Sequence, residues 1–384
     1  MLSRWTVTVL AIAWTGLLTG AGAVAGPHLD WVNSLTPAGE SREGLSLASG
    51  GKTAYRILLS AEPTLQDIKA AADLAQTLWQ ITGAEFPIIC DGQVGADGGR
   101  VISIGRTARM KAADLPQAKA DLGDEGYAIA VKDGCLFIFG GRLRGPIYGV
   151  YAFLEEDMGC RWYVAATAPL WIRTHEPKDR GSLGEPLLPH DPDLRVRPVP
   201  RQFVPPLFLR EPFYADAFDA TWSLQNRVNA PNGRVRDAWG GRVRYTPRYV
   251  HTFRHLMPPA KYFKEHPEYY MLTKDGKRIR RQLCQTHPDV IRIVLAEALR
   301  AIDKDKGHPG QLILEISPND GGRHCHCPTC EKINKENDSP AGSLIYLVNK
   351  IAEGIEKKHP HVLVSTWPIW TPWMRPPGSV PVAT

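Results

Sequence analysis

The sequence predicts an α/β protein in which a small α+β N-terminal domain precedes a partial (β/α) barrel of the TIM type. Two observations lead to this prediction. Between residues 55 and 171, strands and helices mix without a regular order, and an Asp-Gly turn indicates an antiparallel hairpin. From about residue 197, strands and helices alternate, which favours a parallel sheet covered by helices.

The composition excludes several classes of protein. Of the 384 residues, 43% are hydrophobic and 22% are charged, as in an average globular protein, so the chain is not disordered, collagen-like or a coiled coil. The net charge of +6 comes from 46 basic and 40 acidic residues spread along the chain, which gives no reason to expect a nucleic-acid partner. A mean hydropathy of -0.24 excludes a polytopic membrane protein.

Residues 1–25 are typical of a secretory signal peptide. Arg4 supplies the basic start, and an apolar run from Trp5 to Leu18 is too short to span a bilayer. Ala23 and Ala25 flank Val24 in a small-x-small cleavage pattern. We therefore expect export to the periplasm or the extracellular space, with no membrane attachment after cleavage. The sequence makes no prediction of the oligomeric state.

The predicted N-terminal domain covers residues 53–175 and follows an extension at residues 26–52. Thr64 and Asp67 form the pattern of a capping box, and Gly83 ends the helix that they begin. The apolar face of this helix is predicted to contain Leu65, Ile68, Ala72, Ala75, Leu78 and Trp79. Strands are predicted at residues 55–59, 100–105, 127–131 and 136–139, and a second helix at residues 145–158.

A linker rich in Pro, Gly and charge is predicted at residues 176–196, and an incomplete (β/α) barrel at residues 197–384. The predicted barrel strands are residues 201–204, 249–253, 281–285, 312–317 and 363–367. The predicted helices are residues 215–228, 288–303 and 343–358. In such a barrel the active site lies at the carboxyl ends of the strands.

One strand end carries the first candidate for catalysis. Asp320 follows the apolar strand at residues 312–317, where burial can tune a carboxyl group to act as a general acid. Its neighbour Asn319 is a candidate for binding substrate, although Asn-Asp-Gly-Gly is also ordinary turn chemistry. Glu315 lies within the strand and ranks lower, as an ion-paired or solvated residue. His251 and Arg201, also at predicted strand ends, are the other candidates for substrate binding.

A cluster of cysteines follows directly. Cys325, Cys327 and Cys330 have the spacing of metal ligands, and Cys284 ends a predicted strand one unit earlier, where it can supply a fourth thiolate. A structural zinc ion, disulfides favoured by an oxidising compartment, and free thiols remain open as alternatives. A catalytic metal is not expected, because four Cys ligands leave no open position.

Longer stretches of the sequence resemble known families. The segment RGPIYGVYAFLEEDMGCRWY resembles the small α+β domain that precedes the barrel in beta-hexosaminidases and alpha-glucuronidases. The segments HTFRHLMPPAKYFKEHPEYY, QLCQTHPDV and ISPNDGGRHCHCPTC together resemble the uncharacterised, glycoside-hydrolase-like bacterial family named domain of unknown function 4838. The resemblance implies a barrel whose fourth strand ends at Asn319-Asp320. Hexosaminidase-type enzymes carry an acidic pair there, so only Asp320 carries over, as the acid.

The resemblance also implies a function, and it implies that the second domain is shorter than a complete barrel. It implies an exported protein that acts on the glycosidic bonds of a poly- or oligosaccharide and needs no cofactor for catalysis. Residues 197–384 are fewer than the roughly 250 of a typical barrel. Trp367, Trp370 and Trp373 lie in a segment whose sequence differs from the one that family members have from the end of the strand at residues 363–367 onward. We therefore expect a truncated or frameshifted product.

Two other functions remain open from the sequence. The chain is also interpretable as a non-catalytic carbohydrate-binding or scaffold protein that keeps the fold without the chemistry. Alternatively, the cysteine and histidine cluster is the centre of a metal-binding protein.

Overall fold

The computed structural model describes residues 44–93, 99–166, 185–305, 311–321 and 323–367. The predicted signal peptide, the linker up to residue 184 and the chain from residue 368 onward lie outside these ranges. Within them, no helix combines the length and the apolar character needed to cross a membrane.

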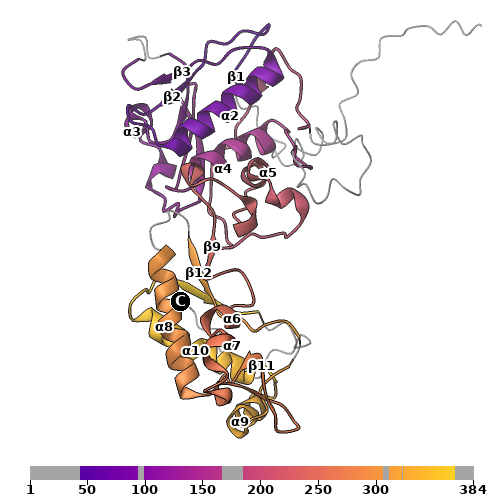
Figure 1. The fold of residues 1–384 in the computed structure, drawn as a ribbon. Coiled ribbons are helices and arrows are strands. Elements are labelled where there is room, and N and C mark those ends of the chain that lie inside the picture. The colour runs from indigo at the N-terminus through magenta and orange to yellow at the C-terminus, as the bar shows by residue number, and fades with distance from the viewer. Residues whose placement is uncertain (1–43, 94–98, 167–184, 306–310, 322, 368–384) are drawn as a thin grey trace, which may run out of the picture. The chain divides into compact units, whose positions relative to one another are not determined.

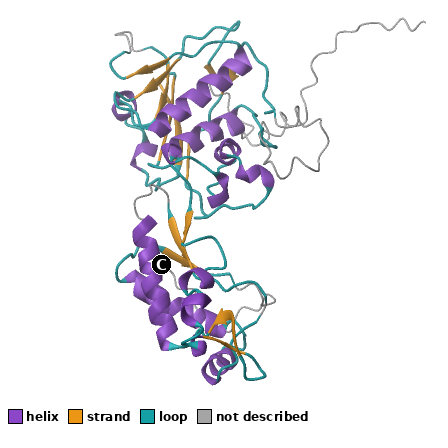
Figure 2. Ribbon diagram, viewed as in Figure 1, coloured by secondary structure: helices purple, strands orange, loops and turns teal. Residues whose placement is uncertain are grey.

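The first sheet has six strands (Figure 2) in the order β3-β2-β4-β6-β5-β8. Its strands are β2 (Arg56–Leu59), β3 (Ile88–Cys90), β4 (Val101–Ile104), β5 (Tyr127–Lys132), β6 (Cys135–Gly140) and β8 (Arg201–Phe203). Strands β3, β2, β4 and β6 are parallel, whereas β5 is antiparallel to both of its neighbours. The hairpin predicted at Asp133-Gly134 is confirmed, and both residues have positive φ angles.

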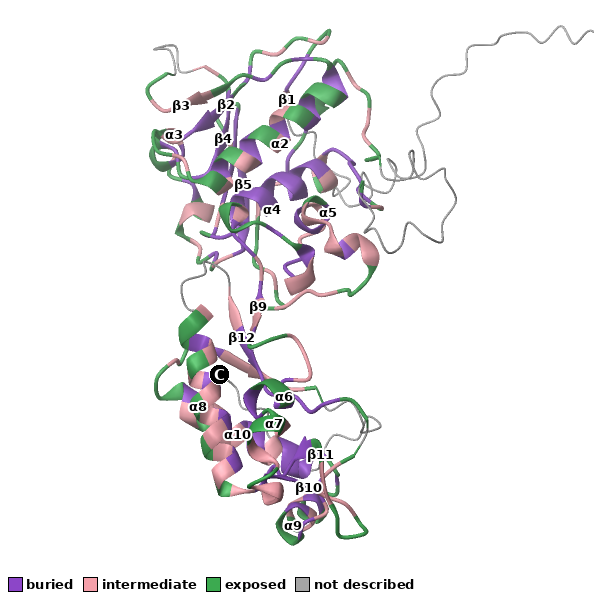
Figure 3. Ribbon diagram, viewed as in Figure 1, coloured by how far each residue is buried: buried purple, intermediate pink, exposed green. Residues whose placement is uncertain are grey.

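Helices cover both faces of this sheet. Helix α2 (Leu65–Thr82) contacts α4 (Gly145–Ala152) (Figure 1), and both pack in the larger core of the sheet. The opposite face packs against α3 (Ala108–Ala112) and the 3₁₀ turn η1 (Pro116–Lys119). Every residue of α4 is buried (Figure 3), and a π-helical turn, η2 (Phe153–Asp157), continues it.

Helix α2 begins and ends as predicted, but it buries a different face. The Thr64–Asp67 capping box is present, and Gly83 adopts the left-handed conformation with a φ angle of 74°. Leu65, Ile68, Ala72 and Trp79 are exposed, so most of the predicted face is wrong, although Leu78 is buried as predicted. The buried residues are Asp67, Ala70, Ala71, Leu74, Thr77, Leu78, Ile81 and Thr82. Small alanines allow close packing against α4, and this contact outweighs the hydrophobicity of the larger side chains.

The second sheet consists of three parallel strands in the order β13-β12-β9. They are β9 (Arg244–Thr246), β12 (Leu312–Glu315) and β13 (Leu363–Ser365). The amphipathic helices α8 (Pro288–Asp305) and α10 (Gly342–Glu356) pack on one face and enclose a core, as the sequence pattern predicts. The chain is thus a mixed α/β protein, and the three described parallel strands do not close into a barrel.

Three predicted barrel strands are corrected. Residues 201–204 form β8, which pairs with β5 in the first sheet instead of starting the second. Residues 249–253 are not a strand, because Pro247 has no N–H to donate and the strand ends before it. The predicted strand at residues 281–285 belongs to an antiparallel hairpin of β10 (Tyr270–Leu272) and β11 (Arg278–Leu283), turned at Gly276.

The remaining elements are short. Asp219 caps a helix inside the segment predicted as one helix at residues 215–228, which is therefore divided in two. The short strands and helices are β1 (Leu45–Ser46), β7 (Arg195–Val196), α5 (Ala220–Gln225), α6 (Phe253–Leu256), α7 (Pro259–Tyr262) and α9 (Pro328–Glu336). The 3₁₀ turns are η3 (Ala215–Phe218), η4 (Pro231–Gly233), η5 (Asp237–Trp239) and η6 (Pro267–Tyr269).

Candidate functional site

The three parallel strands bring polar side chains to one face of their sheet. Leu314 packs into the core with α8 and α10, so its neighbour Glu315 faces the opposite side. The strand register places Ser365 beside Glu315, and Tyr245 beside Ile313 on that same side. The face away from the helices therefore carries a carboxyl group, a hydroxyl and a phenol.

Glu315 is fully buried, with an exposed fraction of 0%. One of its oxygens accepts a hydrogen bond from the Ser365 hydroxyl, and the other has no hydrogen-bond partner among the described residues. Burial raises the pKa of Glu315 to about 7, while the nearby hydroxyls of Ser365 and Ser317 oppose the rise. A carboxyl group with a pKa near 7 is suited to donate a proton at neutral pH.

A second carboxyl group and two tyrosines share this neighbourhood. Burial, together with the charges of Glu211 and Glu315, raises the pKa of Tyr249 to about 12 and also raises that of Tyr245. Glu211 is half-buried, and burial raises its pKa against the opposing hydrogen bond from Asn232. Both phenols therefore lie within electrostatic reach of both carboxyl groups. We name Glu211, Tyr245, Tyr249 and Glu315 the carboxylate–tyrosine site.

Aromatic rings border this site. The ring of Tyr249 contacts that of Tyr245 at a centroid distance of 5.0 Å and that of Trp367 at 5.7 Å. Phe213 stacks on Tyr249 at a centroid distance of 6.2 Å, and Phe213 as a residue is 61% exposed. Exposed aromatic faces beside carboxyl and hydroxyl groups are typical of pockets that bind partly apolar, hydroxyl-rich ligands.

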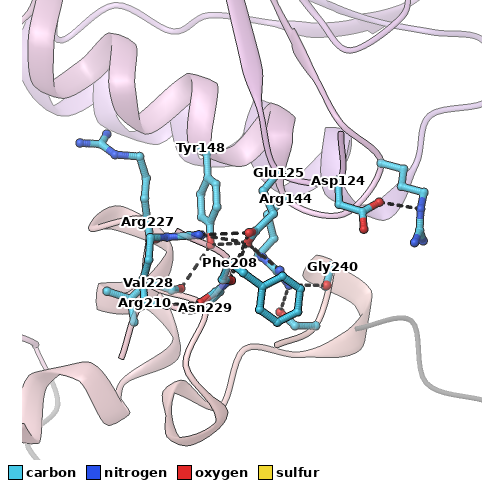
Figure 4. A network of polar contacts seen from close by, with 12 residues as sticks. Asp124, Glu125, Arg144, Tyr148, Phe208, Arg210, Arg227, Val228, Asn229 and Gly240 are labelled. Carbon is cyan, nitrogen blue, oxygen red and sulfur yellow. Dashed lines mark hydrogen bonds and ion pairs between the residues drawn. The ribbon is translucent and has the colours of Figure 1, made fainter. Parts of the chain in front are cut away.

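Glu211 follows Arg210, which belongs to a buried polar network (Figure 4). The carboxylate of Glu125 lies 2.6 Å from Nη2 of Arg144 and 3.0 Å from Nη2 of Arg210, and it accepts a hydrogen bond from Asn229. Burial alone would raise the pKa of Glu125, but Arg144 and Arg210 hold it below its ordinary value. The backbone N–H of Arg210 donates to Asn229 Oδ1 at 2.9 Å. The network therefore fixes the backbone just before Glu211.

Three of the predicted site residues lie together. Nε2 of His251 is 3.2 Å from Oδ2 of Asp320, whose side chain is 75% exposed. Asn319 is buried, and its amide donates to the backbone oxygen of Arg281 at 2.8 Å. Asn319 also exchanges backbone hydrogen bonds with the Gln282 side chain. Asn319 thus joins β12 to β11, while Asp320 and His251 face solvent.

Arg201 lies in another part of the fold. On β8, its guanidinium contacts Asp157 at 2.7 Å and Glu156 at 3.2 Å, and it also donates to the backbone oxygens of residues 152 and 199. These contacts join β8 to the end of η2. The structure does not bring Arg201 into contact with His251, Asn319 or Asp320, and its role in substrate binding stays a prediction.

The four clustered cysteines converge as the sequence predicts. The Sγ atoms of Cys284, Cys325, Cys327 and Cys330 all lie within 4.8 Å of one another, and all four residues are buried. The Sγ atoms of Cys284 and Cys327 are 3.6 Å apart. A tetrahedral zinc ion with bonds of about 2.3 Å places its sulfur ligands about 3.8 Å apart. All seven cysteines lie in described residues and are free thiols.

The surroundings of the thiols also fit a metal ion. The backbone N–H of Leu272 donates to Cys325 Sγ at 3.3 Å, and the Thr286 hydroxyl lies 3.2 Å from Cys330 Sγ. The hydrogen bond between Cys284 and Cys325 raises the pKa of Cys284 to about 12 and lowers that of Cys325. A cation is therefore needed to keep all four as thiolates. The cluster could hold a metal ion with four sulfur ligands.

Sequence reasoning ranks Glu315 low and does not identify the other three members of the carboxylate–tyrosine site. Glu315 interrupts the apolar run Leu312–Ile316, and a carboxyl group inside a buried strand is a signal that could have ranked it above Asp320. Glu211 is separated from Glu315 by about a hundred residues and has no local signal. Tyr245 lies in β9 and Tyr249 follows it, whereas the hydropathy pattern predicts a strand that begins five residues later, at residue 249.

A protein-family model described as Domain of unknown function (DUF4838) matches residues 187–380, half of the chain. The matched residues contain β9, β12, β13 and the cysteine cluster, and they contain all four members of the carboxylate–tyrosine site. No curated protein matches the sequence.

Solved structures of glycoside hydrolases show remote similarity. The 4-O-methyl-alpha-glucuronidase BtGH115A, specific for decorated arabinogalactans, is 12% identical over 84% of this chain and 42% of its own, with a TM-score of 0.37. A GH138 enzyme that targets pectin rhamnogalacturonan II is 11% identical over 81% and 30%, with a TM-score of 0.26. A mutant Streptomyces plicatus beta-hexosaminidase bound to GlcNAc is 11% identical over 85% and 62%, with a TM-score of 0.32. The chain spans less than two thirds of the length of each of these structures.

Proposed function

The chain belongs to the DUF4838 family, and we propose that it is an exported glycoside-hydrolase-like protein acting on O-glycosidic bonds of a poly- or oligosaccharide. The observation that carries the proposal is Glu315, a fully buried carboxyl group with an unpartnered oxygen and a pKa raised to about 7. A carboxyl group with a pKa near 7 is still partly protonated at neutral pH. It can therefore donate a proton to the oxygen of the glycosidic bond that breaks.

The other members of the carboxylate–tyrosine site complete the proposed chemistry. Glycosidases use two carboxyl groups, one as the acid and the other as a base or nucleophile. Glu315 is the proposed acid and Glu211 the proposed second carboxylate. Tyr245, Tyr249 and Trp367 provide hydroxyls and aromatic faces for a sugar ring. Hydrolysis by two carboxyl groups needs no cofactor, and carbohydrate is the proposed partner.

Asp320 is the competing acid. It carries a carboxylate beside His251 at the end of the same strand segment, but its side chain is 75% exposed. Burial therefore favours Glu315 as the acid and leaves Asp320 a role in contacting substrate at the edge of the site.

Replacement of Glu315 by Gln tests the assignment. We expect Glu315→Gln to lower kcat/KM for a cleaved glycan by about 10²–10⁴-fold, because the proton donor is lost. Asp320→Asn is expected to change it by less than about 10-fold, since only a surface contact is removed. Glu353→Gln, on the exposed surface of α10, is the matched control and is expected to have no effect. The measurement is a kinetic assay on substrates identified in a glycan screen.

Two outcomes would contradict the proposal in different ways. If Asp320→Asn abolishes cleavage while Glu315→Gln retains it, the acid is Asp320. If the wild-type protein binds glycans in the screen but cleaves none, the chain is a carbohydrate-binding protein. Thermal denaturation of each variant separates loss of activity from loss of folding.

The pH dependence of stability gives a second test of Glu315. Its pKa is about 7 in the folded chain and about 4.5 when unfolded, so between these values the folded chain keeps a proton that the unfolded chain releases. Its contribution to stability is fully present below pH 4.5 and is lost as the pH rises to about 7, a change of roughly 3 kcal/mol. We expect the free energy of unfolding, measured in urea, to fall over this range relative to Glu315→Gln. A constant difference would disprove the raised pKa.

The cysteine cluster is proposed to hold a structural zinc ion. Cys284, Cys325, Cys327 and Cys330 would supply four thiolates in a closed site, with Leu272 and Thr286 as outer hydrogen-bond donors. Bound zinc would join β11 to the amino end of α9 and to the loop that follows Asp320. Its proposed role is to hold this loop in place beside the strand ends.

A further inference from the structure

The loop that supplies the cysteines carries a second set of metal ligands. His324 and His326 alternate with Cys325 and Cys327 along the chain. Cys325 and Cys327 are buried and turn their sulfur atoms into the cluster, whereas the two His side chains remain 24% and 18% exposed. The backbone N–H of His326 donates to the oxygen of Leu272, which holds this segment against β10. The histidines therefore lie outside the four-thiol cluster.

A carboxylate joins the two histidines. Helix α9 buries Cys330 and exposes the next residue, Glu331, toward the same loop. Oε1 of Glu331 lies 3.5 Å from Nε2 of His324 and is hydrogen-bonded to Nδ1 of His326. The two imidazole rings are 4.3 Å apart. One ligand atom from each of the three side chains thus lies within 4.8 Å of the other two.

We propose that His324, His326 and Glu331 form a second metal site that binds a divalent transition-metal ion such as Zn²⁺, Co²⁺ or Ni²⁺. Two imidazoles and a carboxylate are ligands that these ions accept. Three protein ligands leave at least one position for water or for a ligand from solution, whereas four thiolates fill their ion's positions. The partial exposure of all three side chains lets the ion exchange with solvent. The two sites therefore differ in the softness of their ligands, in their access to solvent and in the number of coordination positions that the protein fills.

The geometry also explains why one carboxylate oxygen faces two imidazoles. A cation placed among the three ligand atoms is attracted by the carboxylate and accepts a lone pair from each ring nitrogen. Without it, Glu331 Oε1 is hydrogen-bonded to His326 Nδ1 and lies 3.5 Å from His324 Nε2. Cys330 and Glu331 are adjacent on α9, so the same short helix supplies one ligand to each site.

Cobalt binding to the full chain tests the proposal. Metal-depleted, reduced protein is titrated with Co²⁺, and bound metal is measured by equilibrium dialysis with elemental analysis. We expect two Co²⁺ per chain, with thiolate-to-cobalt charge-transfer absorption from the first only. His324→Ala with His326→Ala is expected to bind one Co²⁺ and to keep this absorption. His359→Ala with His361→Ala, a second pair of neighbouring rings at 6.2 Å, is the matched control and is expected to bind two.

A single substitution covers the case in which the double variant does not fold. Glu331→Ala, at a half-exposed position, is expected to weaken the second Co²⁺ by at least 10-fold and to leave the first unchanged. Binding of only one Co²⁺ by the wild-type chain, with charge-transfer absorption, would overturn the proposal. Binding of two by the His324 and His326 double variant would also overturn it. If the titration is repeated without reduction and the four thiols form disulfides, the second site alone binds one Co²⁺ without this absorption, so the two metal proposals fail separately.

Discussion

Replacement of Cys284 by Ser is expected to release the proposed structural zinc ion and to unfold the segment around it. Binding of structural zinc to small sites contributes on the order of 10 kcal/mol to folding, and a Ser hydroxyl is a poor substitute for a thiolate. The cluster around the thiols contains few apolar side chains besides Met271, Leu272 and Ile279. Little else is available there to hold β10, β11 and α9 together once the ion is lost.

The measurement is zinc content together with local unfolding. We expect the wild-type chain to contain one tightly held zinc ion and Cys284→Ser to contain none. Hydrogen exchange is expected to lose protection in β10, β11 and α9 but not in the six-stranded sheet. Cys90→Ser is the matched control, since Cys90 lies on β3 and outside the cluster. A wild-type chain without zinc, whose clustered cysteines resist alkylation until a reductant is added, would contradict the expectation and would favour disulfides.

The cysteine cluster shows what local sequence patterns can predict. Three of its cysteines lie within six residues, so their convergence needs only a short loop and the first turn of α9. The fourth, Cys284, was assigned because it ends a predicted strand. That reason was only partly right, since β11 belongs to an antiparallel hairpin and not to a barrel. The Asp275-Gly276 turn is the local signal for this hairpin.

The elements that sequence reasoning placed wrongly depend on distant partners. Nothing in residues 201–203 distinguishes a parallel barrel strand from an antiparallel edge strand, because the choice is made by pairing with β5. Helix α2 shows the same limit. Its ends follow from Thr64 and Gly83, but its buried face follows from contact with α4, about seventy residues later.

The candidate site combines both kinds of information. Asp320, Asn319 and His251 were found because each stands at the end of a predicted strand, and the structure brings these three together. Glu315 can be recognised as a site residue only when its burial is known, and that burial depends on the strands on either side of β12. Glu211 lies near Glu315 only because the chain folds back over about a hundred residues. No local sequence pattern predicts a contact over that distance.

Loss of the buried ion pair between Glu125 and Arg144 is expected to destabilise the chain severely. Arg144 is fully buried, and its guanidinium also donates to the backbone oxygens of Gly240 and Gly241 (Figure 4). Removing one partner of a buried pair leaves the other charge under-compensated, which costs about 3–5 kcal/mol. Glu125 then keeps only Arg210 and Asn229 as partners, so we place the cost of losing Arg144 within this range. We therefore expect Arg144→Met to lower the free energy of unfolding, measured in urea, by this amount.

The adjacent ion pair between Asp124 and Arg142 provides the matched control. It joins the same two segments at 2.9 Å, but the Arg142 side chain is 69% exposed. Arg142→Met is therefore expected to cost less than about 1 kcal/mol, because solvent screens the pair. Equal costs for Arg142→Met and Arg144→Met would show that burial does not decide the strength of these contacts.

The double variant Glu125→Leu with Arg144→Met separates the energy of the pair from the energy of its members. Arg210 and Asn229 lose a partner when Glu125 is removed, so the double variant is expected to remain less stable than the wild type. It is nevertheless expected to cost less than the sum of the two single variants, because each single variant leaves the other charge buried. The same variants are expected to lower the proposed glycan cleavage through Glu211, whose preceding residue, Arg210, is held by Glu125. A double variant whose cost equals the sum would show that Glu125 and Arg144 act independently.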